Sequence, residues 1–174
     1  MFWRNRKSQE ISGPATSVHL RPTLAPVRVL TIDTVIEGWI DQTGQRLSDV
    51  LNVEELLSVS RAAIAPTPGD WFVVERDHML LAVPPPHASD RSVRLHRVKR
   101  RIEIHSGHYL VRGIVHLVAG IDLDPFLARS RQYFLPVTDS HVTSTQWPEM
   151  VEDKPALLVN VRNTEHRLKL EILD

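Results

Sequence analysis

Short apolar segments with a period of two follow one another along most of the chain, separated by turn residues. Val27 and Val29 alternate with other residues near the start of this pattern, and Ile102 and Ile104 alternate in the same way further along. A period of two places successive side chains on opposite faces of a strand. Twelve prolines and seven glycines are typical of a chain with many turns and few long helices. The pattern therefore predicts a mainly β protein.

The apolar positions of residues 27–83 recur in residues 101–172, in the same order and with similar spacing. Each copy reads strand, turn, glycine-containing strand, helical turn, strand, loop, strand, turn, strand. Recurrence over such a distance predicts two structural units of one kind. The alignment pairs Gly38 with Gly113, Ile36 with Val111, Leu47 with Leu123, Leu51 with Leu127, Leu57 with Leu135, Val59 with Val137 and Ile64 with Val142.

The segment RLSDVLN, residues 46–52, interrupts the strands with the pattern of a single helical turn. Ser48 is suited to cap such a turn, because a serine hydroxyl can accept a hydrogen bond from a free backbone N–H group. We expect the leucines of the turn to plug the open end of a strongly bent sheet. The second copy carries DLDPFLA at the corresponding place, with Pro125 early in the turn, as helices tolerate. We expect Leu47, Leu51 and Leu127 to be buried, with Leu123 matching Leu47.

A glycine lies in the strand before each helical turn, at Gly38 and Gly113. We expect both to occupy a sharp bend, where a side chain would crowd the curved sheet. Five short strands around one small core are typical of SH3-like and Sm-like barrels. The predicted fold is mainly all-β, with two tandem five-stranded barrels of this kind, each carrying one short helical turn.

Breaks in the pattern divide the chain into four predicted parts. These are a flexible N-terminal tail at 1–25, a first barrel at 26–86, a basic linker at 87–100 and a second barrel at 101–174. Three prolines at 84–86 predict a stiff polyproline-like spacer at the boundary between the barrels.

The strings EGWI, GQRLSDVLN and LLSVSRAAI of the first copy resemble an uncharacterised bacterial domain family. Its members combine a glycine strand, an R-L-S-D-hydrophobic-L-N turn and a further strand, and the resemblance implies a fold without an activity. The second copy lacks counterparts of Arg46, Ser48 and Asn52. LVRGIV at 110–115 is loosely similar to the Arg-Gly string of Sm-type RNA-binding barrels. That string lies in the second strand of its unit, not the fourth as in Sm proteins, so this likeness implies architecture only.

The net charge is zero but the charges are unevenly placed. Residues 1–24 carry a net charge of +3 and residues 90–101 carry +5, which leaves −8 for the remainder. In residues 91–105 arginine and lysine alternate with apolar residues, so a strand there would present a basic face. Such a face suits acidic protein surfaces, nucleic-acid phosphates or anionic lipid, although it also suits a simple solvated linker.

Several classes of chemistry lack support in the sequence. There is no cysteine, and no GxSxG, Walker A, GxGxxG or HExxH string occurs. Of the nine histidines, the closest pair is His105 and His108, and we expect structural or surface roles for them instead of a metal site. We also expect no cofactor, no membrane-spanning segment and no secretory signal, and hence a cytoplasmic protein.

The leading hypothesis is a non-enzymatic interaction or assembly module that serves as a subunit or adaptor of a bacterial cytoplasmic complex. Its partners would be other proteins or further copies of itself. Two alternatives remain open, namely nucleic-acid binding through residues 91–101 and sensing of a small anion between the copies. The N-terminal tail would dock into a partner or make peripheral membrane contact. The candidate partner-binding residues are Phe2, Trp3, Arg4, Arg94, Arg97, Lys99, Arg100 and Arg101.

Overall fold

The predicted mainly β fold is confirmed by a computed structural model, which describes residues 24–41, 45–61, 67–86, 97–121, 123–129, 131–162 and 169–173. Its strands are β1 (Leu24–Thr31), β2 (Val35–Asp41), β3 (Leu56–Ser60), β4 (Trp71–Glu75), β5 (Met79–Val83), β6 (Arg97–Ser106), β7 (Tyr109–Val118), β8 (Phe134–Ser144), β9 (Val151–Asn160) and β10 (Lys169–Leu173). The helices are α1 (Leu47–Val53) and α2 (Leu123–Arg129), with short 3₁₀ turns η1 (Pro68–Asp70) and η2 (Arg76–His78).

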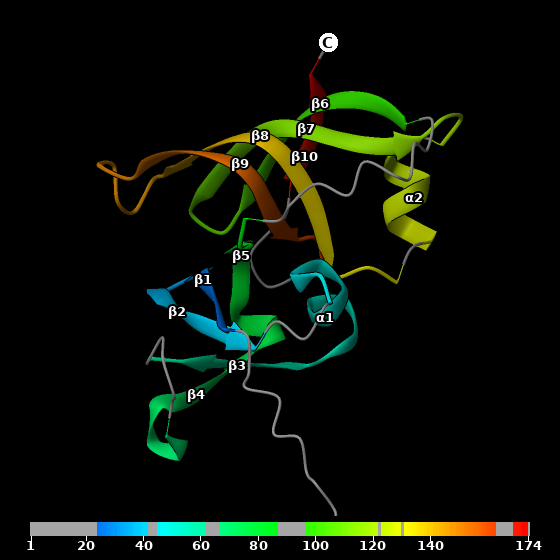
Figure 1. Ribbon diagram of the computed structural model, residues 1–174. Helices are drawn as coiled ribbons and strands as arrows, with labels where there is room; N and C mark the ends of the chain where they lie inside the picture. The colour runs from blue at the N-terminus through cyan, green and yellow to red at the C-terminus, as the bar shows by residue number, and fades with distance from the viewer. Residues whose placement is uncertain are drawn as a thin grey trace, which may run out of the picture.

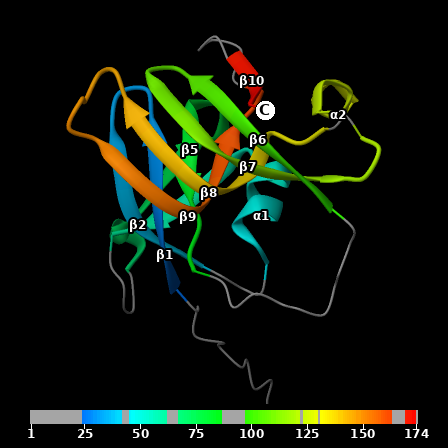
Figure 2. The ribbon, with the colours of Figure 1, turned by 90° about the horizontal axis from the view of Figure 1, so that it is seen from above.

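All ten strands belong to one antiparallel sheet with the order β10-β6-β7-β8-β9-β5-β1-β2-β3-β4. The first five strands of the chain occupy one end of this order and the last five occupy the other. Within each half the order is fifth, first, second, third, fourth strand. Figure 1 shows β6 to β9 with α2 at the top and β1 to β4 with α1 below, and Figure 2 shows β6 to β9 running side by side. The closure of each half into a separate barrel stays a prediction, because the strands form one continuous sheet.

The helical turns lie between the second and third strands of each half, where the sequence predicts them. Leu47, Leu51 and Leu123 are each only 1% exposed, as expected for side chains that plug a core. Leu127 is only partly buried, so the prediction for this residue is wrong. The prediction that Ser48 caps α1 is also wrong, because the helix begins after Arg46 without a side-chain cap and the Ser48 hydroxyl donates to Asp49 Oδ1 at 3.3 Å.

The two glycines lie where the second strand of each half approaches the third. A Cβ atom on Gly38 would lie 2.5 Å from both the carbonyl oxygen of Ser60 and Cγ1 of Val59. A Cβ atom on Gly113 would collide in the same way with Cγ1 of Val137. The predicted crowding at these positions is therefore confirmed, and the physical reason is close packing that leaves no room for a side chain.

Residues 97–100, predicted as the end of a linker, form the beginning of β6 instead. They pair with β7 in continuous register, from Arg97 opposite Val118 to Arg100 opposite Val115. Alternation of basic and apolar residues is compatible with a strand as well as with a linker. These residues form a strand because β7 supplies the backbone hydrogen-bond partners. Residues 87–96 lie outside the described part of the chain, and the domain boundaries themselves stay a prediction.

Two clusters of buried side chains form the core, and each draws on both halves of the chain. The cluster around α1 and β1 to β5 also contains Phe134 and Leu158 of the second half. The cluster around β6 to β9 also contains Leu30, Leu80 and Leu81 of the first half. The two halves are therefore packed against each other as one body.

Candidate functional site

The predicted partner-binding residues fall into two groups. Phe2, Trp3, Arg4 and Arg94 lie outside the described residues, whereas Arg97, Lys99, Arg100 and Arg101 are all exposed on β6. The period of the strand places Arg97, Lys99 and Arg101 on one face and Arg100 on the other. Because β10 pairs with β6 only from Arg101 to His105, the first four residues of β6 lie beyond that neighbour. The structure therefore places three cations on one exposed face, as expected for a basic strand.

His116 lies beside this basic face on β7, opposite Lys99. Its Nε2 atom is 2.9 Å from the hydroxyl of Thr138. Burial lowers the pKa of His116, and the positive charges of Lys99 and Arg97 lower it further. The histidine is therefore held neutral next to the cations, so it adds no positive charge to the face near neutral pH.

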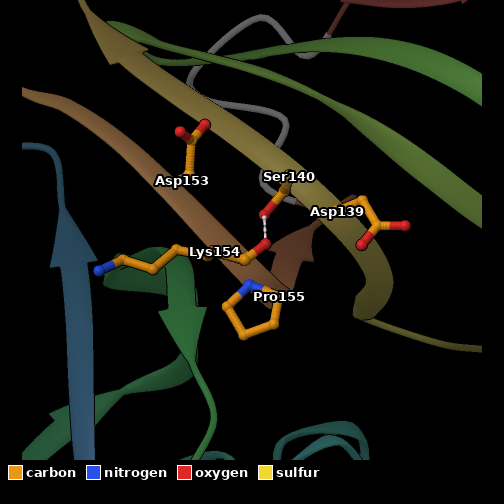
Figure 3. Close-up of a pocket in the computed structure, with 5 residues that line it drawn as sticks. All are labelled: Asp139, Ser140, Asp153, Lys154 and Pro155. Atoms are coloured by element: carbon orange, nitrogen blue, oxygen red, sulfur yellow. Dashed lines mark hydrogen bonds between the residues drawn. The ribbon is translucent and has the colours of Figure 1, made fainter.

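A bulge in β8 creates an open depression of about 360 Å³. Asp139 has a φ of 48°, in the left-handed region, where the register between β7 and β8 shifts. Figure 3 shows the lining residues with their charged groups pointing in different directions, and the Ser140 hydroxyl donates to the carbonyl of Lys154 at 3.1 Å. The Asp153 carboxylate is 2.8 Å from Nδ1 of His141. The depression thus lacks the convergence of a nucleophile and a base that covalent catalysis requires.

Several other ionisable side chains are paired in small groups. Oε1 of Glu103 lies 3.0 Å from Nε2 of His105, and Oε2 of Glu103 accepts a hydrogen bond from Nε of Arg112 at 2.7 Å. The hydrogen bonds from Arg112 and His105 lower the pKa of Glu103. Within the described ranges, no three His, Cys, Asp or Glu side chains gather closely enough to hold a metal ion.

The junction between the halves is a strand pairing of β5 with β9. Leu81 lies opposite Val159 and Ala82 lies opposite Leu158, and all four side chains are buried. The side chain of Asn160 donates from Nδ2 to the carbonyls of Arg76 at 3.2 Å and Met79 at 2.9 Å. This buried amide satisfies two carbonyls of the opposite half, as buried polar groups require.

Asn52, the last residue of the RLSDVLN string, ties α1 to the beginning of β8. Its Oδ1 atom accepts hydrogen bonds from the backbone N–H groups of Tyr133 at 2.7 Å and Phe134 at 2.9 Å. Its Nδ2 atom donates to the carbonyl of Ser48 at 2.7 Å within the helix. Asn52 therefore has a structural role between the halves, which the sequence pattern alone did not indicate.

Charged and aromatic groups complete the junction. Glu152 of β9 binds both Arg28 of β1 at 2.5 Å and Lys154 at 2.9 Å. Burial raises the pKa of Glu152, but the hydrogen bonds from Lys154 and Arg28 together outweigh this effect, and the pKa lies below its ordinary value. Because both cations already bind Glu152, they offer little to a free anion between the halves.

Tyr109 and Arg76 each reach from one half to the other. The buried Tyr109 hydroxyl donates to the carbonyl of Thr31 at 3.1 Å, and burial raises the pKa of this phenol to about 12. The guanidinium of Arg76 lies over the ring of Tyr133, and its Cζ atom is 3.5 Å from the ring centroid. These contacts fix the two halves relative to each other.

The two end strands of the sheet, β4 and β10, each pair with a neighbour on one side only among the described strands. The end formed by β4 is also apolar on its outer face. Leu56 and Val73 are 56% and 57% exposed, and Val53 at the end of α1 is 74% exposed. Leu56 faces Glu75 and Ser58 faces Val73, so Leu56 and Val73 are diagonal neighbours on the same face. We call Val53, Leu56 and Val73 the β3–β4 patch.

The β3–β4 patch is not predicted by the spacing of apolar residues, because a period of two does not distinguish an inward apolar face from an outward one. A signal was nevertheless present. In the alignment Leu56 corresponds to Phe134, and both strands carry apolar residues on two faces at this point. Apolar residues on both faces of a short strand indicate that the strand is covered on both sides.

No protein-family model, curated protein or solved structure matches this chain. Among the described elements, no helix is long and apolar enough to cross a membrane.

Proposed function

We propose that this protein is a non-enzymatic interaction module that assembles with other protein chains through the exposed end of its sheet. The observation that carries this proposal is the β3–β4 patch next to the edge of β4, which pairs with no further strand among the described residues. An edge strand presents a row of free backbone N–H and C=O groups to which another strand can be added. Exposed Leu56 and Val73 lie beside that row and supply apolar contacts for the incoming strand.

The edge of β4 carries few features that oppose such pairing. Natural edge strands are commonly blocked by proline, by lysine or by inward-pointing charges. The strand WFVVE has only one charged residue, Glu75 at its end, and no proline. The composition of β4 therefore supports a strand that accepts a partner.

The test compares variants of the patch with variants of equally exposed valines elsewhere. The tagged chain and its Val73→Arg, Leu56→Asp, Val118→Arg and Val151→Arg variants are purified from native cells after nuclease treatment. Val118 and Val151 are 54% and 58% exposed, so they match Val73 in accessibility. We expect a protein in stoichiometric amount that is lost only with Val73→Arg and Leu56→Asp. An identical set of proteins with all five baits would reject the proposal.

A second candidate function, nucleic-acid binding, is favoured by the exposed cations of β6. Arg97, Lys99 and Arg101 share one face, with spacing that follows the strand. Phosphate contacts of this kind would make binding strongly dependent on salt. Binding of labelled RNA and DNA is measured at low and high salt for the native chain, for Lys99→Glu/Arg101→Glu and for Arg46→Glu/Arg131→Glu, a control at exposed arginines with the same change of charge. Equal binding by the two variants, or no binding at low salt, would reject this function.

A further inference from the structure

We infer that the partner of the β3–β4 patch is a second copy of this chain, whose β10 adds to the edge of β4. This inference rests on the proposed function, since it names the occupant of the same patch. It is argued from the junction between β5 and β9, which already joins two units of the same strand order within one chain. In that junction the fourth strand of one half pairs with the fifth strand of the other half. The fourth and fifth strands left over are β4 and β10.

The strand registers match the fourth strands of the two halves residue by residue. Leu57 lies opposite Val74 in the first half, and Leu135 lies opposite Val159 in the second. Val59 packs against Gly38, and Val137 packs against Gly113. Leu57 and Leu135 each lie two residues before that valine, so they are equivalent. Val74 is therefore equivalent to Val159, and by the same count Val73 is equivalent to Leu158.

The outer faces of these equivalent strands differ in what covers them. Phe134 and Leu158 are 0% and 4% exposed, because the core of the first half packs against them. Their equivalents Leu56 and Val73 are more than half exposed. The same two positions of the same structural unit are therefore buried where a neighbouring unit is present and exposed where none is present. The patch has the composition of a junction that lacks its neighbour.

The other end of the molecule shows the corresponding deficit. Leu51 of α1 is 1% exposed and shares a cluster with Phe134 of the second half. Leu127 of α2 occupies the equivalent place and is only partly buried. In a junction between copies, Leu56 of one copy would approach Leu127 of the next, as Phe134 approaches Leu51 within the chain. The partial exposure of Leu127 then has the same origin as the exposure of Leu56.

The fifth strands are matched in the same manner, which gives the register of the new pairing. Val29 lies opposite Ala82, and Ile104 lies opposite Leu170. Val27 faces Gly38 and Ile102 faces Gly113. Val29 and Ile104 each lie two residues further along the strand, so they are equivalent. Leu170 is therefore equivalent to Ala82. Transfer of the Ala82–Leu158 pair predicts that Leu170 of one copy faces Val73 of the next.

The junction between copies lacks two contacts of the internal one. The position of Asn52 is taken by Ala128 in the second half, which has no side-chain acceptor for backbone N–H groups. The position of Asn160 is taken by Glu75, which cannot donate to carbonyls as the amide does. Association between copies is therefore weaker than the packing of the halves and depends on concentration. Its geometry is head to tail, which produces a closed ring or an open filament.

The first experiment measures the mass of the purified 19.8 kDa chain by light scattering over a wide concentration range. We expect the mass to rise with concentration above that of the monomer. Val73→Arg and Leu56→Arg should weaken this association at least tenfold, whereas Val118→Arg and Val151→Arg leave it unchanged. The substituted side chains are exposed, so loss of association would not reflect loss of the fold, which circular dichroism checks.

The second experiment tests the register and uses the absence of native cysteine. Val73→Cys and Leu170→Cys chains are mixed and mildly oxidised, because directly opposed residues of an antiparallel pair lie within reach of a disulfide. We expect a covalent dimer in the mixture and none with either chain alone. A mixture of Val151→Cys with Leu170→Cys is the matched control and should not cross-link. A chain carrying both Val73→Cys and Leu170→Cys should give a ladder, or a single closed species.

Monomeric mass at every concentration together with no cross-link would overturn the inference. The proposed function would survive that result if Val73→Arg still abolished the binding of a different protein from native cells. If neither self-association nor such a partner depends on Val73, the proposed function fails as well.

Discussion

The third and fourth strands of the two halves are alike in register and different in surroundings. Phe134 and Leu158 are buried against the first half, while Leu56 and Val73 at the same places face outward. Burial in this chain therefore depends on the presence of a neighbouring unit as much as on the strand itself. An exposed apolar patch is recognised in this way, since its equivalent elsewhere in the molecule shows what covers it.

The largest difference in stability is expected between truncations of the equivalent side chains Phe134 and Leu56. Phe134→Ala should lower the free energy of unfolding by about 3–5 kcal/mol, because a fully buried ring is replaced by a cavity. Leu56→Ala in the dilute, monomeric chain should change it by less than about 0.5 kcal/mol, as exposed positions usually do. Urea unfolding measures both values. Equal losses for the two variants would break the distinction between a covered and an uncovered unit.

The likeness of the halves is tested at the glycines. Gly38→Ala and Gly113→Ala should each lower the free energy of unfolding by about 1–3 kcal/mol, because the added methyl group collides with the neighbouring strand. Gly69→Ala is the control, since a Cβ atom there meets nothing within 4 Å. A neutral effect at only one of the two strand glycines would show that the halves are not built alike.

The asymmetry of the junction is tested at Asn52. Asn52→Ala should cost about 1–3 kcal/mol of unfolding free energy, because the N–H groups of Tyr133 and Phe134 lose their acceptor. Asn52→Asp keeps the acceptor but replaces the Nδ2 donor to the Ser48 carbonyl by an oxygen, so it should be destabilising as well. Ser48→Ala serves as a control within the same helix, because its hydroxyl donates only weakly, at 3.3 Å, to an exposed carboxylate. Thermal melts of the three variants rank these effects. An Asn52→Ala variant with unchanged stability would contradict a stabilising role for the hydrogen bonds of Asn52 to Tyr133 and Phe134.

The smallest effect is expected from the ion pairs of the junction. The pKa of Glu152 is lowered in the folded chain, so its contribution is fully present above its ordinary pKa of 4.5 and is lost as the pH falls through the folded value. Glu152→Gln should remove this part of the acid dependence, with a change of about 1 kcal/mol or less at neutral pH. Unfolding measured from neutral to acidic pH detects it. An unchanged acid limb in the variant would assign the dependence to other carboxylates such as Glu103.

The pattern of the sequence was sufficient for those features that arise within one half. A period of two, the glycines and the leucines of the helical turns reflect contacts between neighbouring strands, and these are visible as spacing. Leu127 shows where such reasoning ends, because its exposure depends on what lies beyond its own half. Asn52 shows the same for polar residues, since its partners lie more than eighty positions away in the chain.

The β5–β9 pairing also has a consequence for synthesis of the chain on the ribosome. Asn160 and Met79, which it brings together, are 81 residues apart, so the first half is complete long before its neighbour exists. Until β9 emerges, the strand Met79–Val83 offers a second open edge made of apolar residues. Nascent chains at this stage are the ones most exposed to premature pairing with one another. A fragment that stops at residue 86 should therefore aggregate. In the complete chain, β9 of the second half covers the edge of β5 and so protects the first half from such pairing.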